Sequence, residues 1–311
     1  MHRFAPLAAV VLLLPAAATA RPSGGSVVEF VTEPPSQLLV AAGHELLATV
    51  SVAPGPTAVA ASVDSRVVLV VSPAAGALTV VDGRRRAVLA TIVDFRRPVD
   101  VALAPGGRVA YVADAGARRL AVLDLPRRRI VSRITLPGRP LHLAVHDQEL
   151  WVMFERGGRS PEVLDVSHPA RPRPVGRVHL GGAVREVAFG SDGLHAYATF
   201  YGPRLARLWS LAFQRSPVRR RALAAPISTL AVDVLGRVWT AGGSRLSIRS
   251  PRSLAVVRSI RLRAPIRKLV AEGGFVFALT TEGVTTLDIV RQRPTATVLV
   301  PRLAGIATAT M

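Results

Sequence analysis

The sequence of 311 residues contains no cysteine and no asparagine, and its single lysine, Lys268, stands beside 39 arginines. The absence of cysteine excludes a disulfide framework, a lipid-modified N-terminal cysteine and thiol-dependent catalysis. Aromatic residues make up only 5% of the chain, and 20 acidic residues face 40 basic ones. The resulting net charge of +20 favours an anionic partner or surface over a basic one.

Long apolar runs are also missing after residue 20, since none reaches the roughly 18 residues that suggest a membrane-spanning helix. The first twenty residues differ, with Arg3 followed by an apolar core over 8–14 and an Ala-x-Ala sequence at 18–20. This order is typical of a secretory signal peptide. We therefore expect cleavage after Ala20, a mature chain of residues 21–311 without a transmembrane segment, and a secreted, periplasmic or cell-envelope location.

What the sequence does contain is a repeat. An anchor residue, usually proline, precedes a short apolar run at intervals of 42, 42, 42, 44, 39 and 36 residues. The anchors are Pro56, Pro98, Pro140, Gly182, Pro226, Pro265 and Pro301. In the unit that begins at Pro98, four short β-type runs follow one another with turn residues between them. Four such runs in a period near forty are typical of one blade of a β-propeller.

The number of blades follows from the two ends of the chain. Six full units begin near residues 57, 99, 141, 183, 227 and 266, and residues 303–310 leave room for one more strand. Three further strands are expected at 27–31, 37–41 and 45–52. One C-terminal and three N-terminal strands complete a seventh blade and close the ring. We predict an all-β fold, a single seven-bladed β-propeller; six blades with a separate N-terminal segment is the alternative.

Two kinds of residue recur within the unit. A bulky side chain stands in the second run, and an aspartate ends the third run of four units. The bulky residues are Leu69, Tyr111, Trp151, Tyr197, Trp239 and Phe277, and the aspartates are Asp82, Asp124, Asp165 and Asp288. We expect the bulky residues to pack between blades and the aspartates to form turns through hydrogen bonds to the backbone.

The second unit reads Tyr-Val-Ala-Asp-Ala-Gly at 111–116 and Leu-Ala-Val-Leu-Asp at 120–124. It resembles the repeat of the YVTN-type β-propeller family, a WD40/YVTN repeat-like pattern in which a Tyr-Val-x-Asn strand precedes a Val-Ile-Asp strand. Asp114 stands where that family has asparagine. Members of that family are mostly exported or envelope proteins without an assigned function, so the resemblance implies an exported repeat protein, for which a ligand-binding module or interaction scaffold is our interpretation. Some seven-bladed relatives resemble sugar-lactone hydrolases, so a lactonase-like hydrolase is the alternative.

The inner strands of a propeller line a central channel, and several of them start with polar residues. The aligned positions hold Ala58, Asp100, His142, Glu186, Thr229, Arg267 and Leu303. Asp100, His142, Glu186 and Arg267 form the candidate ligand site at the channel mouth, suited to a small molecule. Two carboxylates and an imidazole also suit a divalent metal, and a histidine beside a carboxylate suits general-base catalysis. The structural alternative is a hydrated channel in which opposite charges pair.

No nucleophile elbow, phosphate loop or histidine-rich zinc motif occurs. The sequence therefore assigns no cofactor and no catalytic residue, and it leaves metal binding open. Gluconolactonase-like propellers that depend on a metal use asparagine among their contacts, and this chain has none. A binding or scaffold function is the prediction.

Arginine triplets fall in the predicted turns between third and fourth strands, at 84–86, 127–129 and 219–221. Equivalent turns of a propeller lie on one face. The candidate anionic-partner face comprises Arg84, Arg85, Arg86, Arg127, Arg128 and Arg129. An acidic protein, an acidic polymer or the envelope surface is the expected partner, and a solvated surface without a partner is the alternative. The lack of stacking aromatics beside these arginines argues against nucleic acid.

Overall fold

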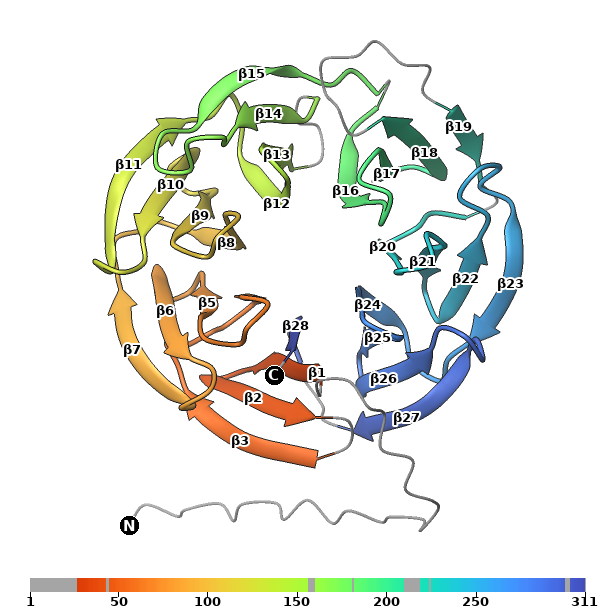
Figure 1. Ribbon diagram of the computed structural model, residues 1–311, viewed down its shortest axis with the longest axis horizontal. Helices are drawn as coiled ribbons and strands as arrows, with labels where there is room; N and C mark the ends of the chain where they lie inside the picture. Colours follow the sequence, from red (N-terminus) through yellow and green to blue (C-terminus); the bar gives the residue numbers. More distant parts are fainter. Residues whose placement is uncertain are drawn as a thin grey trace, which may run out of the picture.

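The computed structural model describes residues 27–42, 45–155, 160–180, 182–209, 219–223, 225–299 and 303–310. In these ranges the regular elements are all strands, which form seven four-stranded antiparallel sheets arranged as a ring (Figure 1). The prediction of an all-β, seven-bladed propeller is confirmed. Within the same ranges no helix is long and apolar enough to span a membrane. The predicted signal peptide, residues 1–20, lies outside the described residues.

We number the blades 1 to 7 along the chain and give each from its inner to its outer strand. Blade 1 consists of β28 (Gly305–Thr310), β1 (Val27–Glu33), β2 (Gln37–Ala42) and β3 (Glu45–Ser51). Blade 2 consists of β4 (Ala58–Ala61), β5 (Val68–Ser72), β6 (Ala77–Asp82) and β7 (Ala87–Ile92). Blade 3 consists of β8 (Pro98–Leu103), β9 (Val109–Asp114), β10 (Arg119–Asp124) and β11 (Arg129–Thr135).

The remaining four blades follow the same order. Blade 4 consists of β12 (Pro140–His146), β13 (Glu149–Phe154), β14 (Glu162–Asp165) and β15 (Arg173–Arg177). Blade 5 consists of β16 (Val184–Phe189), β17 (His195–Phe200), β18 (Arg204–Trp209) and β19 (Arg219–Ala222). Blade 6 consists of β20 (Thr229–Val232), β21 (Val238–Gly242), β22 (Arg245–Arg249) and β23 (Val256–Arg261). Blade 7 consists of β24 (Ile266–Glu272), β25 (Phe275–Thr280), β26 (Gly283–Asp288) and β27 (Arg293–Leu299).

The ring closes inside blade 1. The C-terminal strand β28 pairs antiparallel with the N-terminal strand β1, so that Val28 lies opposite Ala309 and Val31 opposite Ile306. One strand from the C-terminal end and three from the N-terminal end therefore build one sheet, as predicted. The alternative of six blades with a separate N-terminal segment is wrong, because pairing of the two ends leaves no blade open.

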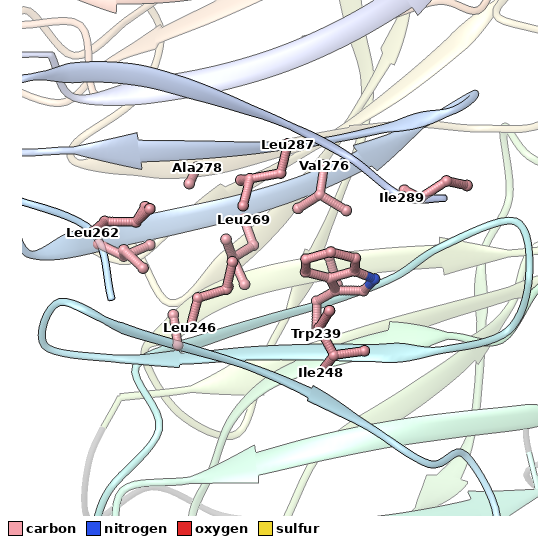
Figure 2. Packing of buried hydrophobic residues seen from close by; sticks show 12 residues of the cluster. Trp239, Leu246, Ile248, Leu262, Leu269, Val276, Ala278, Leu287 and Ile289 are labelled. Atoms are coloured by element: carbon pink, nitrogen blue, oxygen red, sulfur yellow. The ribbon is translucent and has the colours of Figure 1, made fainter. Parts of the chain in front are cut away.

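The core lies between the blades, where the described residues form seven hydrophobic clusters. Each contains the bulky side chain that stands at the same position of the second strand of one blade, at most 2% exposed: Phe30, Leu69, Tyr111, Trp151, Tyr197, Trp239 and Phe277. The inner-strand residue opposite is alanine in every blade except blade 7, where it is Val270. A small neighbour leaves room for the ring. Figure 2 shows Trp239 of blade 6 packed toward Leu269 and Val276 of blade 7.

The aspartates that end the third strands form the turns that follow. Asp82 Oδ1 accepts hydrogen bonds from the N–H groups of Arg84 and Arg85 at 3.1 and 2.9 Å. Equivalent bonds to the turn backbone are made by Asp124, Asp165 and Asp288. The prediction that these aspartates form turns through the backbone is confirmed, and they need no functional role to account for their position.

Asp114, which replaces the asparagine of the YVTN repeat, anchors the entry into blade 3. Its carboxylate is 5% exposed and accepts three backbone hydrogen bonds. The N–H of Arg96 donates to Oδ2 at 3.0 Å, and the N–H groups of Arg97 and Ala117 donate to Oδ1 at 2.9 and 3.2 Å. An asparagine has one acceptor oxygen where the carboxylate has two, so the aspartate suits this arrangement better.

Replacing Asp114 by alanine is expected to lower the free energy of unfolding by about 2–3 kcal/mol, because partly buried N–H groups lose their acceptor. Asp114→Asn is expected to lower it by about 1 kcal/mol, since the amide nitrogen would face the N–H of Arg96. Urea unfolding monitored by circular dichroism measures both values. Alanine at Asp82, whose turn is exposed, is the control, and a loss there as large as at Asp114 would contradict the assignment.

Candidate functional site

The inner strands of four blades begin with a β-bulge, and the strand register identifies equivalent positions in the channel. The residues directly after the bulge are Asp100, His142, Glu186 and Lys268. In blade 7 Ile266, rather than the anchor Pro265, occupies the place of Pro98 in blade 3. The spacing from Pro265 predicts Arg267 at the channel position, and the register places Lys268 there, one residue further along the chain.

Arg267 is the bulged residue, and its side chain is exposed. Its Nη1 donates to the carbonyl oxygen of Leu303 at 2.9 Å, which ties blade 7 to the segment that leads into β28. Leu303 itself precedes β28 and is buried in the cluster between blades 7 and 1. The register places Gly305, not Leu303, opposite Thr32 at the start of this inner strand.

The polar side chains of the channel form hydrogen bonds from one blade to the next. Leu143 N–H of blade 4 donates to Asp100 Oδ2 of blade 3 at 2.9 Å. Leu230 N–H of blade 6 donates to Glu186 Oε2 of blade 5 at 3.2 Å. In the same way Leu269 N–H of blade 7 donates to Thr229 Oγ1 of blade 6 at 3.1 Å. Each donor follows the equivalent position of the next blade by one residue, so the bonds fasten successive inner strands together.

Lys268 and Glu186 form an ion pair that links blade 7 to blade 5 past blade 6. Lys268 Nζ donates to Glu186 Oε1, and Glu186 is 7% exposed. Burial alone would lower the pKa of Lys268, but the charge and hydrogen bond of Glu186, helped by Asp100, raise it above its usual value. The lysine therefore stays positively charged, and both oxygens of Glu186 already have donors.

His142 and Asp100 are also brought together. His142 Nδ1 lies 3.4 Å from Asp100 Oδ2, and the side chains are 34% and 19% exposed. Asp100 Oδ1 additionally accepts the N–H of Val101 at 2.9 Å, so both of its oxygens have backbone donors. Over the described ranges no set of three or more histidine, aspartate or glutamate side chains is placed to hold a metal ion. Asp100, His142 and Glu186 thus share the channel without forming such a set.

The arginine triplets differ from one another in position. Arg84, Arg85 and Arg86 lie in the turn between β6 and β7, and all three are exposed. Arg127 and Arg128 lie in the turn between β10 and β11, and Arg129 begins β11. The third triplet is not in a turn, because Arg219–Ala222 form the outer strand β19. The connection after β18 is longer than those in blades 2 and 3, which shifts that triplet onto the strand.

The channel cluster and the arginine turns lie on opposite faces of the ring. Asp100 is opposite Ala113, beside the end of β9. Asp124, which leads into the arginine turn of the same blade, is opposite Val109 at the other end of β9. Because the strands are antiparallel, the two ends of β9 belong to the two faces of the disc. A ligand at the channel mouth and a partner on the arginine turns would therefore not compete.

The face with the arginine turns also holds a groove that sequence reasoning missed. Its volume is about 780 Å³, it lies between blades 3 and 4, and four arginines line it: Arg108, Arg127, Arg171 and Arg173. Of these only Arg127 belongs to a triplet. Arg171 and Arg173 stand in a proline-rich segment, and their alternation with Pro172 and Pro174 is the one local signal.

Comparisons with known proteins bear on the fold. No protein-family model matches the chain, and no curated protein sequence matches it. A functionally unknown protein from Desulfotomaculum acetoxidans superposes with a TM-score of 0.78 at 14% identity, over 91% of this chain and 99% of that one. The shared feature is the β-propeller. Apo AztD from Citrobacter koseri gives a TM-score of 0.68 at 10% identity, over 92% and 98% of the two chains.

A third similar structure is the β-propeller domain of Cps50 (Swd1) from Myceliophteria thermophila. Its TM-score is 0.64 at 13% identity, over 80% of this chain and 88% of that domain. Identities this low show a common fold and carry no function from one protein to another. The function of the propeller must be argued from its own surfaces.

Proposed function

We propose that this protein is an exported, YVTN-type propeller that works as a binding module for an anionic partner and not as a hydrolase. The main supporting observation is the set of exposed guanidinium groups on equivalent turns of blades 2 and 3, all on one face. The order of residues 1–20 supports export, and the strands around 111–124 support the YVTN relationship. A propeller fold is well suited to present such a face.

Local contacts orient the arginines of the blade 2 turn and leave much of their charge available. Arg84 Nε donates to the carbonyl oxygen of Asp64 at 2.9 Å, and Arg86 Nη1 donates to that of Leu47 at 3.1 Å. Carbonyl groups hold a guanidinium in place without neutralising it. Arg85 Nε lies 3.9 Å from Asp82 Oδ2, in a pair whose arginine side chain is 81% exposed. An exposed pair of this kind is weak and leaves the arginine open to a competing anion.

The contacts of the channel residues argue against the hydrolase alternative. The carboxylates of Asp100 and Glu186 each have donors at both oxygens, and three of these four bonds connect different blades. A metal ion or a reacting substrate would have to share oxygens that already hold the ring together. The lactonase-like alternative is supported by a histidine, His142, beside the carboxylate of Asp100. That carboxylate, however, already accepts backbone hydrogen bonds that stabilise the fold.

Neutralising the arginine turns is expected to weaken binding to an anionic polymer at least tenfold at low salt. The variant carries glutamine at residues 84–86 and 127–129, and the probe is immobilised dextran sulfate with uncharged dextran as reference. Surface charges act through screened electrostatics, so wild-type binding should fall steeply as salt rises, and the variant should show a shallower dependence. Surface plasmon resonance at several salt concentrations measures both quantities.

A matched control removes six exposed arginines from the opposite face, with the same change in net charge. These are Arg118, Arg119, Arg139, Arg245, Arg261 and Arg263. If binding depends on the arginine turns, this control retains most of the affinity of the wild type. If both variants lose the same affinity, binding depends only on net charge, which would contradict a dedicated binding face. Binding that does not change with salt concentration would contradict it as well.

A further inference from the structure

The groove between blades 3 and 4 collects positive charge from three separate segments. Arg108 comes from the turn between β8 and β9, and Arg127 from the turn between β10 and β11. Arg171 lies just before β15, and Arg173 is the first residue of that strand. Ser132 of the outer strand β11 adds a hydroxyl group. Figure 1 shows β10 and β11 of blade 3 beside β14 and β15 of blade 4, at the edge of the ring. The four arginines thus come from segments that are separate in the sequence, and the packing of blade 3 against blade 4 brings them together.

The charge of the groove is not balanced by its own acidic residue. Asp124 is the carboxylate among the lining residues, and Arg127 occupies it, with the backbone N–H on Oδ1 at 2.9 Å and Nη1 on Oδ2 at 2.7 Å. These bonds hold the pKa of Asp124 below its usual value, so it stays ionised and pairs with Arg127. No salt bridge within the described part of the chain involves Arg108, Arg171 or Arg173, although Asp165, which stands opposite Arg173 in the register of β14 and β15, offsets part of the charge of that arginine.

The backbone around the groove is held in place. Tyr111 donates its hydroxyl to the carbonyl oxygen of Pro169 at 3.0 Å, which fastens the blade 4 connection onto blade 3. The N–H of Leu125 donates to the carbonyl oxygen of Arg108 at 3.0 Å, and this bond joins the two turns of blade 3 that supply arginines. A ligand would therefore meet segments that are already positioned, which reduces the ordering cost of binding.

The chemistry of the lining selects a type of anion. A carboxylate offers two acceptor oxygens, and one guanidinium can engage both of them. Several guanidinium groups facing one groove are better matched by a tetrahedral oxyanion, which offers three or more oxygens and, as phosphate, up to two charges. Val131, which is 42% exposed, and Ile134 add apolar surface to the same groove. The volume lies in the range of about 300–1,000 Å³ that is common for small-molecule sites.

We propose that this groove binds an organic ligand that carries several tetrahedral oxyanions, as phosphate or sulfate esters, with its carbon skeleton against the apolar wall. Arg108, Arg171 and Arg173 contact the oxyanions, and Ser132 donates to them. The proposal rests on the proposed function, because it names the anion class and the place where binding is anchored.

The test uses two small polyanionic probes. Inositol hexakisphosphate represents the phosphate esters and sucrose octasulfate the sulfate esters, with citrate as the carboxylate control. Isothermal titration calorimetry on the purified protein is expected to show binding of at least one of the two esters, stronger than that of citrate. Binding of one ester alone identifies the source of the oxyanion. Failure of both esters to bind more tightly than citrate would overturn the proposal.

The variants place the binding in the groove. A triple substitution to glutamine at Arg108, Arg171 and Arg173 is expected to weaken binding of the ester at least tenfold. The matched control, glutamine at Arg119, Arg245 and Arg263 on the opposite face, removes the same charge and is expected to change ester binding less than threefold. Equal losses in the two triples would overturn the groove as the site. An unchanged unfolding midpoint in both variants ensures that the comparison concerns folded protein.

The outcomes separate this inference from the proposed function. If dextran sulfate binding depends on the arginine turns but neither ester depends on Arg108, Arg171 and Arg173, the binding face stands and the groove is wrong. If an ester depends on those three arginines while dextran sulfate is indifferent to residues 84–86 and 127–129, the groove stands and the wider face is wrong.

Discussion

Asp233→Ala is expected to lower the free energy of unfolding by about 3–5 kcal/mol, the range for breaking a buried ion pair. The Asp233 carboxylate is 1% exposed. Its Oδ2 accepts Arg237 Nε and Trp239 Nε1, both at 2.8 Å. Its Oδ1 accepts the N–H groups of Leu235 and Arg237, both at 3.0 Å. The substitution thus removes the acceptor of four donors at once.

The effect of Asp233 reaches into the neighbouring blade. Arg237, positioned by Asp233, donates Nη2 to the carbonyl oxygen of Ile289 in blade 7 at 2.6 Å. Trp239, positioned by the same carboxylate, is the bulky side chain between blades 6 and 7. Loss of the carboxylate therefore weakens a contact between blades as well as a turn, which is why we expect a larger effect than for an ordinary turn residue.

Guanidinium unfolding monitored by tryptophan fluorescence measures the change at Asp233. The control is Asp288→Ala in blade 7, whose carboxylate also accepts two turn N–H groups but is more exposed. A loss of about 1 kcal/mol is expected there. Arg237→Ala combined with Asp233→Ala should cost less than the sum of the two single changes, because both act on one interaction. Additive losses would contradict the assigned pair.

The fold could be predicted from the sequence because each blade repeats the same local requirements. A bulky residue in the second strand needs a small partner in the first, as Tyr111 and Ala102 illustrate. A turn after the third strand needs an acceptor such as Asp82. These requirements act over short stretches of chain and recur with the blade, so their spacing is visible without a structure.

The candidate sites could be predicted only in part, because they depend on contacts between blades. In blade 7 the spacing of the repeat differs from the strand register by one residue at the start of β24. The spacing therefore predicts Arg267 where the structure has Lys268, and no local pattern in the sequence signals that shift. Nor could the sequence show that Glu186 reaches both Leu230 and Lys268, which lie in two other blades. The turn aspartates were recognised because their partners are two or three residues away.

The two faces of the ring divide the charged residues by role. On the channel side, carboxylates such as Asp100 have partners that join blades, and burial makes those partners necessary. On the opposite side, arginines such as Arg171 are exposed and lie beside apolar surface in a groove. Charges that stabilise the fold are satisfied within it, whereas charges that remain unbalanced at a concave surface are the better guide to function.

Glu29 is expected to make the stability of the ring depend on pH by about 3 kcal/mol. It lies on β1, opposite Thr308 of the C-terminal strand, is 2% exposed, and its Oε1 has no hydrogen-bond partner among the described residues. Burial raises its pKa from 4.5 to about 7. The folded state thus holds this proton more tightly than the unfolded state does. Its contribution is complete below pH 4.5 and is lost as the pH rises to about 7.

Glu29→Gln keeps the shape of the side chain and removes the titration. We expect the variant to match the wild type near pH 4.5 and to exceed its free energy of unfolding by about 3 kcal/mol at pH 8. Guanidinium unfolding across this range gives the difference, in which the other titrating groups cancel. Glu45→Gln, at an exposed carboxyl of the same blade, is the control for removing one negative charge from this sheet. A Glu29 difference that stays constant with pH would mean that the carboxyl is solvated in the folded protein. A difference that grows with pH would instead identify the pairing of β1 with β28 as the place where rising pH loosens the closed ring.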